Sequence, residues 1–86
     1  MKIEIYTKSN CRYCVLAKDF LKRKNIEYTE YSIEEEEHLQ SFKDRCGPTV
    51  KTVPQIFRNN ERIGGYDDMM KVTHLFENIT IEKINL

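Results

Sequence analysis

Residues 2–14 read KIEIYTKSNCRYC. Apolar and charged side chains alternate at the start of this stretch, which indicates a short β-strand over residues 2–7. Ser9 and Asn10 follow, and both offer capping side chains for a helix over about residues 11–24. The apolar stripe expected along this helix consists of Ala17, Phe20 and Leu21. A Cys-x-x-Cys sequence therefore lies where a strand ends and a helix begins.

Further elements follow this strand and helix along the chain. They are a strand over residues 26–33, a helix ending at Gly47-Pro48, a hairpin of strands 55–58 and 61–63 around Asn59-Asn60, and a helix over about residues 67–77. Ser32 and Glu35 have the spacing of a capping box for the second helix. The apolar side of that helix is expected at Leu39, Phe42 and Cys46. Residues 79–86 follow no single period and stay unassigned between an extra edge strand and a helix extension packed on the core.

This order of elements predicts the fold class. A strand, a helix and a second strand, then a helix, a hairpin and a last helix imply an α/β domain. We expect a four-stranded mixed sheet flanked by about three helices. The first two strands are expected to be parallel and joined by a right-handed crossover.

The length and composition of the chain bound its class. Its 86 residues suffice for a single domain, which we expect to span residues 1–86. Fourteen basic residues balance fourteen acidic ones, so no long-range field is expected to attract nucleic acid or an anionic membrane. No apolar run reaches the length of a signal peptide or a membrane span. Three cysteines are an odd number, which argues against a disulfide-stapled secreted scaffold. We therefore expect a cytoplasmic protein.

Cys11-Arg12-Tyr13-Cys14 is the clearest chemical signal in the sequence. In a reducing compartment this spacing indicates either redox chemistry or metal binding. Cys11, at the start of the helix, is expected to be the exposed nucleophile, and Cys14, one turn further, to be more buried and to resolve a mixed disulfide. Tetrahedral zinc requires four ligands. The other possible ligands are Cys46, His38 and His74. None of them lies at a short, ligand-like spacing from another possible ligand, so no metal site is expected. Cys46 is interpreted as a small core residue.

The nucleophile in such chemistry is the thiolate. A free cysteine, with a pKa near 8.5, is only about 3% ionised at pH 7, and lowering that pKa by two units requires about 2.7 kcal/mol in favour of the anion. A helix N-terminus supplies about 0.3–2 kcal/mol. Lys8, Arg12 and a hydrogen bond from the Cys14 thiol add to it. These contributions suffice together but not singly.

Three blocks of sequence extend the signal beyond the cysteines. They are Tyr6-Thr7-Lys8 with Cys11-x-Tyr13-Cys14, then Thr52-Val53-Pro54-Gln55-Ile56-Phe57, then Ile63-Gly64-Gly65-Tyr66-Asp67-Asp68. In order and spacing they resemble the glutaredoxin family over about residues 1–76. The resemblance implies a thioredoxin-like fold with a cis peptide bond between Val53 and Pro54. It also implies an oxidoreductase that reduces protein disulfides and glutathione mixed disulfides, with glutathione as co-substrate and no permanently bound cofactor.

The resemblance further implies a set of glutathione-binding residues. They are Lys8, Tyr13, Gln40, Thr52, Val53, Pro54, Gly65, Tyr66, Asp67 and Asp68. Lys8 resembles the family's anchor for the glycyl carboxylate, and Gln40 its assisting amide. The main chain of Val53 would pair with the cysteinyl part of glutathione, and Tyr13 would wall the groove. The helix N-terminus at Gly65–Asp68 would hold the γ-glutamyl carboxylate and one of its aspartates the ammonium, although these aspartates also suit simple capping.

Arg12 departs from the family's commonest dithiol motif, which has proline at this position. Arginine adds a positive charge beside the nucleophile and removes a rigid ring. Family members that bind iron–sulfur clusters lack that proline, so a cluster-binding glutaredoxin is one alternative function. A thioredoxin-like reductant recharged by a reductase protein is another. The expected partners of a monomeric protein are glutathione and disulfide-containing or glutathionylated proteins, with ribonucleotide reductase as a candidate.

Overall fold

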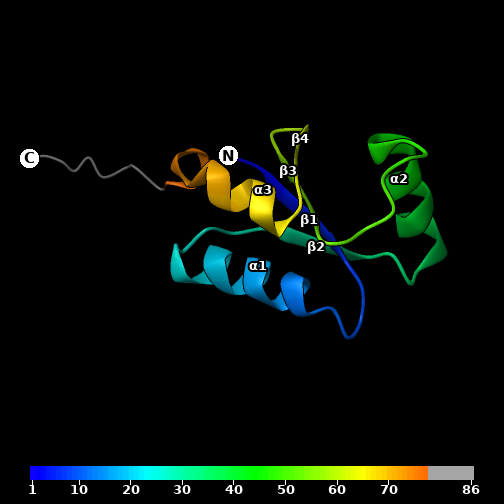
Figure 1. Cartoon of the computed structure of the whole chain (residues 1–86), viewed down its shortest axis with the longest axis horizontal. Helices are drawn as coiled ribbons and strands as arrows, with labels where there is room; N and C mark the ends of the chain where they lie inside the picture. Colours follow the sequence, from blue (N-terminus) through cyan, green and yellow to red (C-terminus); the bar gives the residue numbers. More distant parts are fainter. Residues whose placement is uncertain (78–86) are drawn as a thin grey trace, which may run out of the picture.

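The computed structural model of the chain describes residues 1–77, which form one sheet with helices on both faces (Figure 1). The strands are β1 (Ile3–Thr7), β2 (Thr29–Ser32), β3 (Gln55–Arg58) and β4 (Glu61–Gly64), and the helices are α1 (Arg12–Arg23), α2 (Glu36–Cys46), α3 (Tyr66–Lys71) and the 3₁₀ helix η1 (Thr73–Phe76). The strand order is β2-β1-β3-β4, with β1 parallel to β2 and β3 antiparallel to both β1 and β4. The predicted mixed sheet and its parallel first pair are confirmed. The unassigned stretch 79–86 lies outside the described residues.

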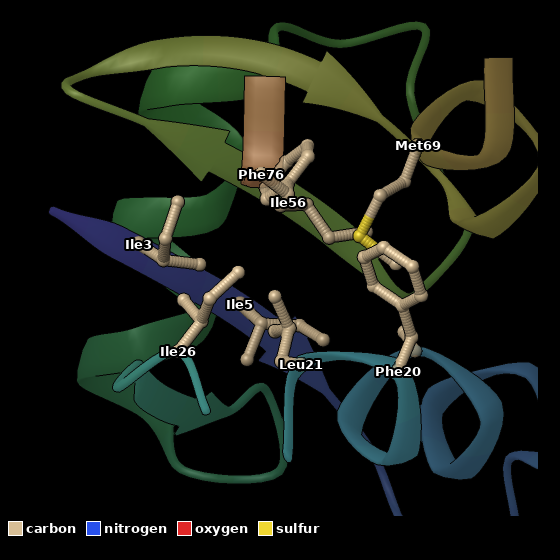
Figure 2. Packing of buried hydrophobic residues seen from close by; sticks show 9 residues of the cluster. Ile3, Ile5, Phe20, Leu21, Ile26, Ile56, Met69 and Phe76 are labelled. Atoms are coloured by element: carbon tan, nitrogen blue, oxygen red, sulfur yellow. The ribbon is translucent and has the colours of Figure 1, made fainter. Parts of the chain in front are cut away.

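One face of the sheet, which we call the α1–α3 face, packs against α1, α3 and η1 through an apolar core (Figure 2). The strands contribute Ile3, Ile5 and Ile56, all nearly inaccessible to solvent. The helices and the segment between α1 and β2 contribute Ala17, Phe20, Leu21, Ile26, Met69 and Phe76. The stripe predicted for the first helix is therefore confirmed, and it faces the central strand.

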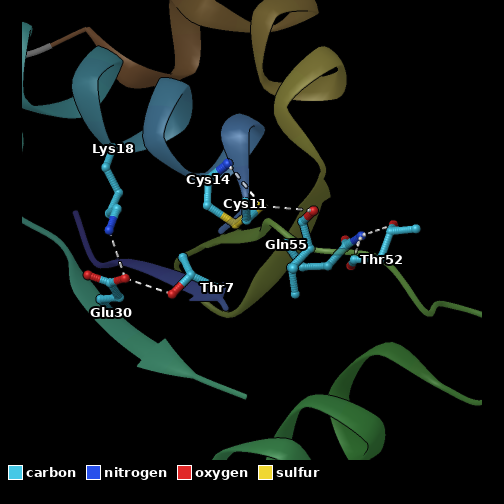
Figure 3. Close-up of a disulfide and its surroundings, with 8 residues drawn as sticks. Thr7, Cys11, Cys14, Lys18, Glu30, Thr52 and Gln55 are labelled. Atoms are coloured by element: carbon cyan, nitrogen blue, oxygen red, sulfur yellow. Dashed lines mark hydrogen bonds and ion pairs between the residues drawn. A yellow bond between two sulfur atoms is a disulfide. The ribbon is translucent and has the colours of Figure 1, made fainter. Parts of the chain in front are cut away.

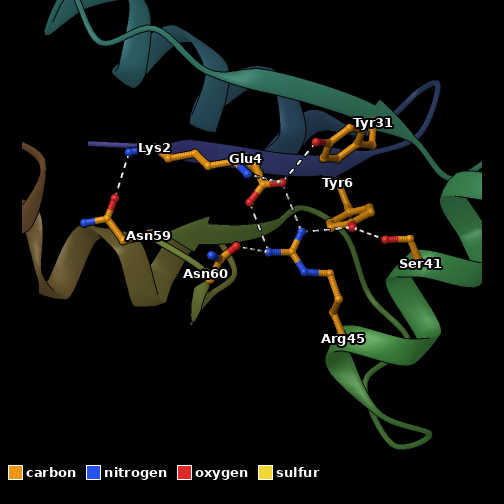
Figure 4. A network of polar contacts seen from close by, with 8 residues as sticks. All are labelled: Lys2, Glu4, Tyr6, Tyr31, Ser41, Arg45, Asn59 and Asn60. Atoms are coloured by element: carbon orange, nitrogen blue, oxygen red, sulfur yellow. Dashed lines mark hydrogen bonds and ion pairs between the residues drawn. The ribbon is translucent and has the colours of Figure 1, made fainter.

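The opposite face, which we call the α2 face, combines aromatic rings with an ion pair (Figure 4). Tyr6 lies between Phe42 of α2 and Phe57 of β3, with ring centroids 5.6 and 5.8 Å away. Glu4 points to this face because side chains alternate along β1. Arg45 of α2 donates two hydrogen bonds to the Glu4 carboxylate, at 3.0 and 3.2 Å, and its guanidinium lies 3.9 Å from the centre of the Phe57 ring.

Glu4 is only 4% exposed, and Arg45 is the ion-pair partner of its carboxylate. Burial alone would raise the pKa of Glu4, but the hydrogen bonds from Arg45 and from the Tyr31 hydroxyl outweigh burial and hold it below its ordinary value. Arg45 also donates to the Tyr6 hydroxyl at 3.1 Å, and that hydroxyl lies 2.6 Å from the hydroxyl of Ser41. This network fixes α2 to the central strand.

The second strand is shorter than the predicted range 26–33, because residues after α1 complete the helix end. Asn25 has a positive φ of 59°. Its N–H donates to the carbonyl of Lys22, and the N–H of Ile26 donates to the carbonyl of Leu21 at 2.9 Å. This Schellman arrangement satisfies the last carbonyl groups of the helix and buries Ile26 against it.

Two further helix boundaries differ from the prediction. The capping box of Ser32 and Glu35 is wrong: Ser32 forms a turn with Glu34 and Glu35, and α2 begins at Glu36 without a side-chain cap. The last helix is not continuous over residues 67–77. The α-helix stops at Lys71 and the 3₁₀ helix η1 follows it, because the β-branched side chains of Val72 and Thr73 disfavour a regular α-helix. Within residues 1–77, no helix is both long and apolar enough to cross a membrane.

Candidate active site

Cys11 and Cys14 form a disulfide at the N-terminus of α1 (Figure 3). Cys11 is the N-cap residue rather than the first helical residue, and its Sγ accepts a hydrogen bond from the backbone N–H of Cys14 at 3.2 Å. A sulfur at this position faces the unpaired N–H groups of the first helical turn, which favour an anion. Cys14 is 2% exposed, whereas Cys11 is half-buried. The two cysteines therefore differ in access to a partner.

The loop between β1 and α1 positions Cys11 without a helix cap from Ser9 or Asn10. Asn10 has a positive φ of 55°, a conformation that asparagine tolerates better than most residues, and it turns the chain from the strand into the helix. The Ser9 hydroxyl donates to the carboxylate of Glu34 at 2.7 Å instead of capping α1. The prediction that Ser9 and Asn10 cap this helix is wrong because Cys11 itself occupies the N-cap position.

The loop before β3 passes next to the sulfur of Cys11. The Val53–Pro54 peptide bond is cis, as the resemblance implied. The carbonyl oxygen of Val53 lies 3.6 Å from Cys11 Sγ. A substrate sulfur bonded to Cys11 would therefore lie against the main chain of this loop.

Gln55 holds that loop in place and was not singled out from the sequence. It is 4% exposed, and its Nε2 donates to the carbonyl oxygen of Thr52 at 3.1 Å. Its Oε1 accepts a hydrogen bond from Arg62 of β4 at 3.1 Å. The signal that could have revealed this role is an amide at the start of an otherwise apolar strand, since buried polar groups require partners.

Beside this loop lies a groove of about 350 Å³, which we call the α3-side groove. It is lined by Tyr13, Thr52, Val53, Pro54, Gly65, Tyr66, Asp67 and Asp68, eight of the ten residues expected to bind glutathione. The rings of Tyr13 and Tyr66 pack with centroids 5.9 Å apart. Among residues 1–77, the charged residues in its lining are the two aspartates. The groove thus offers main-chain groups, aromatic rings and carboxylates.

Asp68 has a structural role within this groove. Gly65 is the N-cap residue of α3, and its N–H donates to Asp68 Oδ2 at 3.0 Å. Gly64 has a φ of +122°, and a Cβ there would collide with the Asp68 carboxylate. Glycine at this position therefore permits both the backbone turn and the close approach of the aspartate. Asp67, which is exposed, carries the groove's other carboxylate.

The structure does not bring Lys8 and Gln40 into the α3-side groove. Gln40, exposed on α2, donates from its Nε2 to Asp44 at 3.0 Å. Lys8 lines a second groove of about 500 Å³, which we call the α1-side groove. Its lining consists of Lys8, Asn10, Cys11, Arg12, Cys14 and Val15. The disulfide thus lines the α1-side groove, whereas the α3-side groove reaches it only through Val53, whose carbonyl oxygen is 3.6 Å from Cys11 Sγ.

An ion pair joins α1 to β2 one helical turn after Cys14 (Figure 3). Lys18 Nζ lies 3.0 Å from Glu30 Oε2, and the Thr7 hydroxyl donates to the same oxygen at 2.6 Å. Burial raises the pKa of Glu30, but these two hydrogen bonds outweigh burial and bring it below its ordinary value. The pair is a partly exposed contact between α1 and β2, added to the apolar core that holds this helix.

The remaining cysteine and histidines lie on other elements. Cys46, at the end of α2, is half-buried, and burial raises the pKa of its thiol. His74 is exposed, whereas His38 is half-buried against the Tyr31 ring, with centroids 5.1 Å apart. In the described part of the chain, one set of side chains is close enough to share a metal ion, namely Glu35, Glu37 and His38. This set contains neither redox cysteine.

The fold and the site together define a class of protein. A thioredoxin-like domain with a Cys-x-x-Cys disulfide at the N-terminus of its first helix is a thiol–disulfide oxidoreductase. The family model for glutaredoxin matches residues 3–63, and the chain belongs to the glutaredoxin family. The thioredoxin-like fold predicted from the sequence is confirmed by solved structures that share the fold of this chain.

Individual relatives agree with this assignment. A probable glutaredoxin of Synechocystis is 40% identical over 68 residues, which cover 79% of this chain and 77% of that protein. Glutaredoxin 3 of Escherichia coli is 41% identical over 68 residues, which cover 78% of this chain and 80% of that protein. The crystal structure of glutaredoxin 1 from Francisella tularensis complexed with cacodylate has a TM-score of 0.73 at 32% identity, over 86% of this chain and 93% of that one.

Proposed function

We propose that the protein is a glutathione-dependent oxidoreductase that reduces protein disulfides and glutathione mixed disulfides through Cys11 and Cys14. The α3-side groove carries the proposal. It adjoins Cys11 at Val53, whose carbonyl oxygen is 3.6 Å from the sulfur, and it continues to the carboxylates at the start of α3. Glutathione is a short peptide with a thiol at its centre and an ammonium at one end, so its chemistry matches both parts of this groove.

The residues of the groove suggest how glutathione would lie. Its cysteinyl part would pair with the main chain of Val53, as an added strand pairs with a sheet edge. Its ammonium would face Asp67, because Asp68 already accepts a hydrogen bond from the Gly65 N–H. Its glycyl carboxylate would extend past Cys11 toward Lys8, which is exposed on the other side. Gln40 would assist there only after releasing Asp44.

Reduction of a protein disulfide takes two exchange steps. The Cys11 thiolate attacks one substrate sulfur, forms a mixed disulfide, and releases the other substrate sulfur as a thiolate that takes up a proton. Cys14, after losing its proton to solvent, attacks Cys11 Sγ, closes the Cys11–Cys14 disulfide and releases the second substrate thiolate. Two glutathione molecules then reduce this disulfide and leave as glutathione disulfide. Each cycle transfers two electrons from glutathione to the substrate.

The setting of this activity is also part of the proposal. We propose that the protein acts as a monomer in the reducing cytoplasm, with glutathione as co-substrate and no permanently bound cofactor. Its substrates would be disulfide-containing or glutathionylated proteins, with ribonucleotide reductase as a candidate. The family membership and the redox cysteines support this setting.

A coupled assay tests the electron source. NADPH oxidation should be fast with glutathione and glutathione reductase, and slow when thioredoxin reductase replaces both. The opposite result would assign the protein to the thioredoxin-like reductants. Absorbance of the freshly purified protein in the visible range would detect an iron–sulfur cluster and test the cluster-binding alternative.

Two cysteine variants test the division of labour. Cys14→Ser should keep most activity on small glutathione mixed disulfides, because a second glutathione can resolve the Cys11 adduct. It should lose much of its activity on protein disulfides, because intramolecular attack by Cys14 has a high effective concentration. Cys11→Ser should lose both activities. Loss of both activities in Cys14→Ser would contradict the two-route scheme.

A further inference from the structure

The α1-side groove is the part of the disulfide's surroundings that glutathione recognition leaves largely unused. Both redox cysteines belong to its lining, whereas neither belongs to the lining of the α3-side groove. A molecule in the α1-side groove therefore touches the residues that form and resolve a mixed disulfide. That is the position required of a partner whose disulfide is being exchanged.

The two grooves carry opposite charge. The charged lining residues of the α1-side groove are Lys8 and Arg12, both basic and both exposed. Part of the Lys8 charge is offset by Glu34, whose pKa is lowered by its hydrogen bond from Ser9 and also by the charge of Lys8. Arg12 is therefore the dominant charge of this groove. The groove attracts carboxylates, while the aspartates of the α3-side groove repel them.

An exposed apolar side chain completes the groove. Val15 is 53% exposed and is one of three large apolar side chains that are exposed within residues 1–77. Its N–H donates to the carbonyl of Cys11 at 3.2 Å, so the two residues lie one turn apart on the same side of α1. An apolar side chain of a bound polypeptide could cover Val15, whereas a small hydrophilic thiol would leave it in water.

We propose that the α1-side groove binds an acidic and apolar polypeptide segment that flanks the disulfide of the partner protein. Carboxylates of the segment face Arg12 and Lys8, and an apolar side chain covers Val15. This arrangement brings a sulfur of the partner to Cys11 for the first exchange step, in which Cys11 bonds to that sulfur and the other leaves as a thiolate. The inference rests on the proposed function for its substrate class, a protein disulfide.

A single-turnover experiment without glutathione tests this inference. The protein is reduced, freed of reductant and mixed with one of two peptides that contain an intramolecular disulfide and a neighbouring leucine. The peptides differ only in three residues beside the reactive cysteine, which are glutamates in one and lysines in the other. Acid quenching and mass spectrometry give the rate of peptide reduction. At low salt the acidic peptide should react about three- to tenfold faster, and the difference should shrink at high salt.

Charge reversal locates the effect. Arg12→Glu should lower the acidic-to-basic rate ratio about tenfold. The ratio cancels any effect of Arg12 on the reactivity of Cys11, since both peptides meet the same nucleophile. Arg23→Glu is the matched control, an exposed arginine in the last turn of the same helix, and should leave the ratio unchanged. Val15→Ser should slow the acidic peptide with leucine more than the same peptide with serine in its place.

Equal rates for the two peptides with the unsubstituted protein would overturn the inference. So would an equal change of the ratio in Arg12→Glu and Arg23→Glu. Because glutathione is absent, these outcomes say nothing against glutathione as the electron source. Failure of the proposed function would appear separately, as slow NADPH oxidation in the glutathione-coupled assay.

Discussion

The two faces of the sheet are built from alternate residues of one strand, but they hold their helices by different forces. On β1, Ile3 and Ile5 join the apolar core of the α1–α3 face, whereas Glu4 and Tyr6 join the α2 face. Apolar burial depends little on pH or salt, while the α2 face depends on an ion pair with Arg45. The helix that carries both redox cysteines, α1, is on the apolar face. The redox site therefore lies on the face whose packing is less sensitive to pH and salt.

The largest expected effect is the loss of a large side chain from the α1–α3 face. Leu21 is completely buried. Leu21→Ala should lower the free energy of unfolding by about 2–5 kcal/mol, because it removes apolar burial and leaves a cavity. Urea unfolding measures this change. Val15→Ala, an exposed position on the same helix, is the matched control and should change stability by about 0.5 kcal/mol or less. A loss at Leu21 no larger than that of the control would contradict the role given to this core.

On the α2 face, removal of Arg45 should lower the free energy of unfolding by less than the loss of Leu21 does. It should do so by leaving a buried carboxylate without its ion-pair partner. Arg45→Met leaves the Glu4 carboxylate without its guanidinium partner and should lower the free energy of unfolding by about 1–3 kcal/mol. Adding Glu4→Gln should recover part of the loss, because a neutral amide is cheaper to bury. Redox activity per folded molecule should stay unchanged, since α2 supplies no lining residue of either groove. Lost activity at full stability would show that α2 also positions the site.

The cysteines of the two faces should differ in reactivity. With limiting iodoacetamide at neutral pH, Cys11 of the reduced protein should be alkylated at least tenfold faster than Cys46, a difference of about 1.4 kcal/mol. The N–H groups of α1 favour the Cys11 thiolate, whereas burial raises the pKa of the Cys46 thiol. Peptide mapping identifies the labelled residue, and Cys11→Ser is the control. Preferential labelling of Cys14 or Cys46 would reverse the assignment of the nucleophile.

The smallest expected effect is on the acid side of the stability profile. The pKa of Glu4 is lower in the folded protein than its ordinary value of 4.5. Its contribution to stability is therefore fully present above that value and is lost as pH falls through the lower folded value. Between pH 7 and pH 3, the unsubstituted protein should lose more stability than Glu4→Gln, as urea unfolding at the two pH values would show. Both proteins retain Glu30 and Glu34, so the difference isolates Glu4. Parallel profiles would mean that the ion pair contributes no net stability.

Local patterns in the sequence were sufficient for most elements but not for their ends. The alternation at Ile3 and Ile5 predicted the central strand, and Asn59-Asn60 predicted the hairpin, where both residues adopt positive φ. The start of α2 was predicted at Ser32 but lies at Glu36, because tertiary packing decides whether a marginal helix end forms. The break at Val72 was missed although its cause, two successive β-branched residues, is local. The pairing of Arg45 with Glu4 could not be predicted, since 41 residues separate them.

The site shows the same division between local and long-range information. The spacing of Cys11 and Cys14 predicted the disulfide, because both residues lie within one helical turn. The groove residues after position 50 were expected only from a family resemblance, since nothing local joins them to the cysteines. The support of the Thr52 loop by Gln55, and the existence of the α1-side groove, required the arrangement of separate elements in space.

β1 lies at the centre of the sheet but early in the chain. During biosynthesis, one of its two edges therefore stays without a partner strand for several seconds. Ile5 pairs with Ile56, which is translated 51 residues later. At about 5–20 residues per second, this interval lasts roughly 3–10 s. β2 can cover one edge of β1 early, since only α1 separates the two strands. The other edge has to wait for β3, and a nascent chain stalled before Gln55 would present unpaired backbone groups to any neighbouring strand.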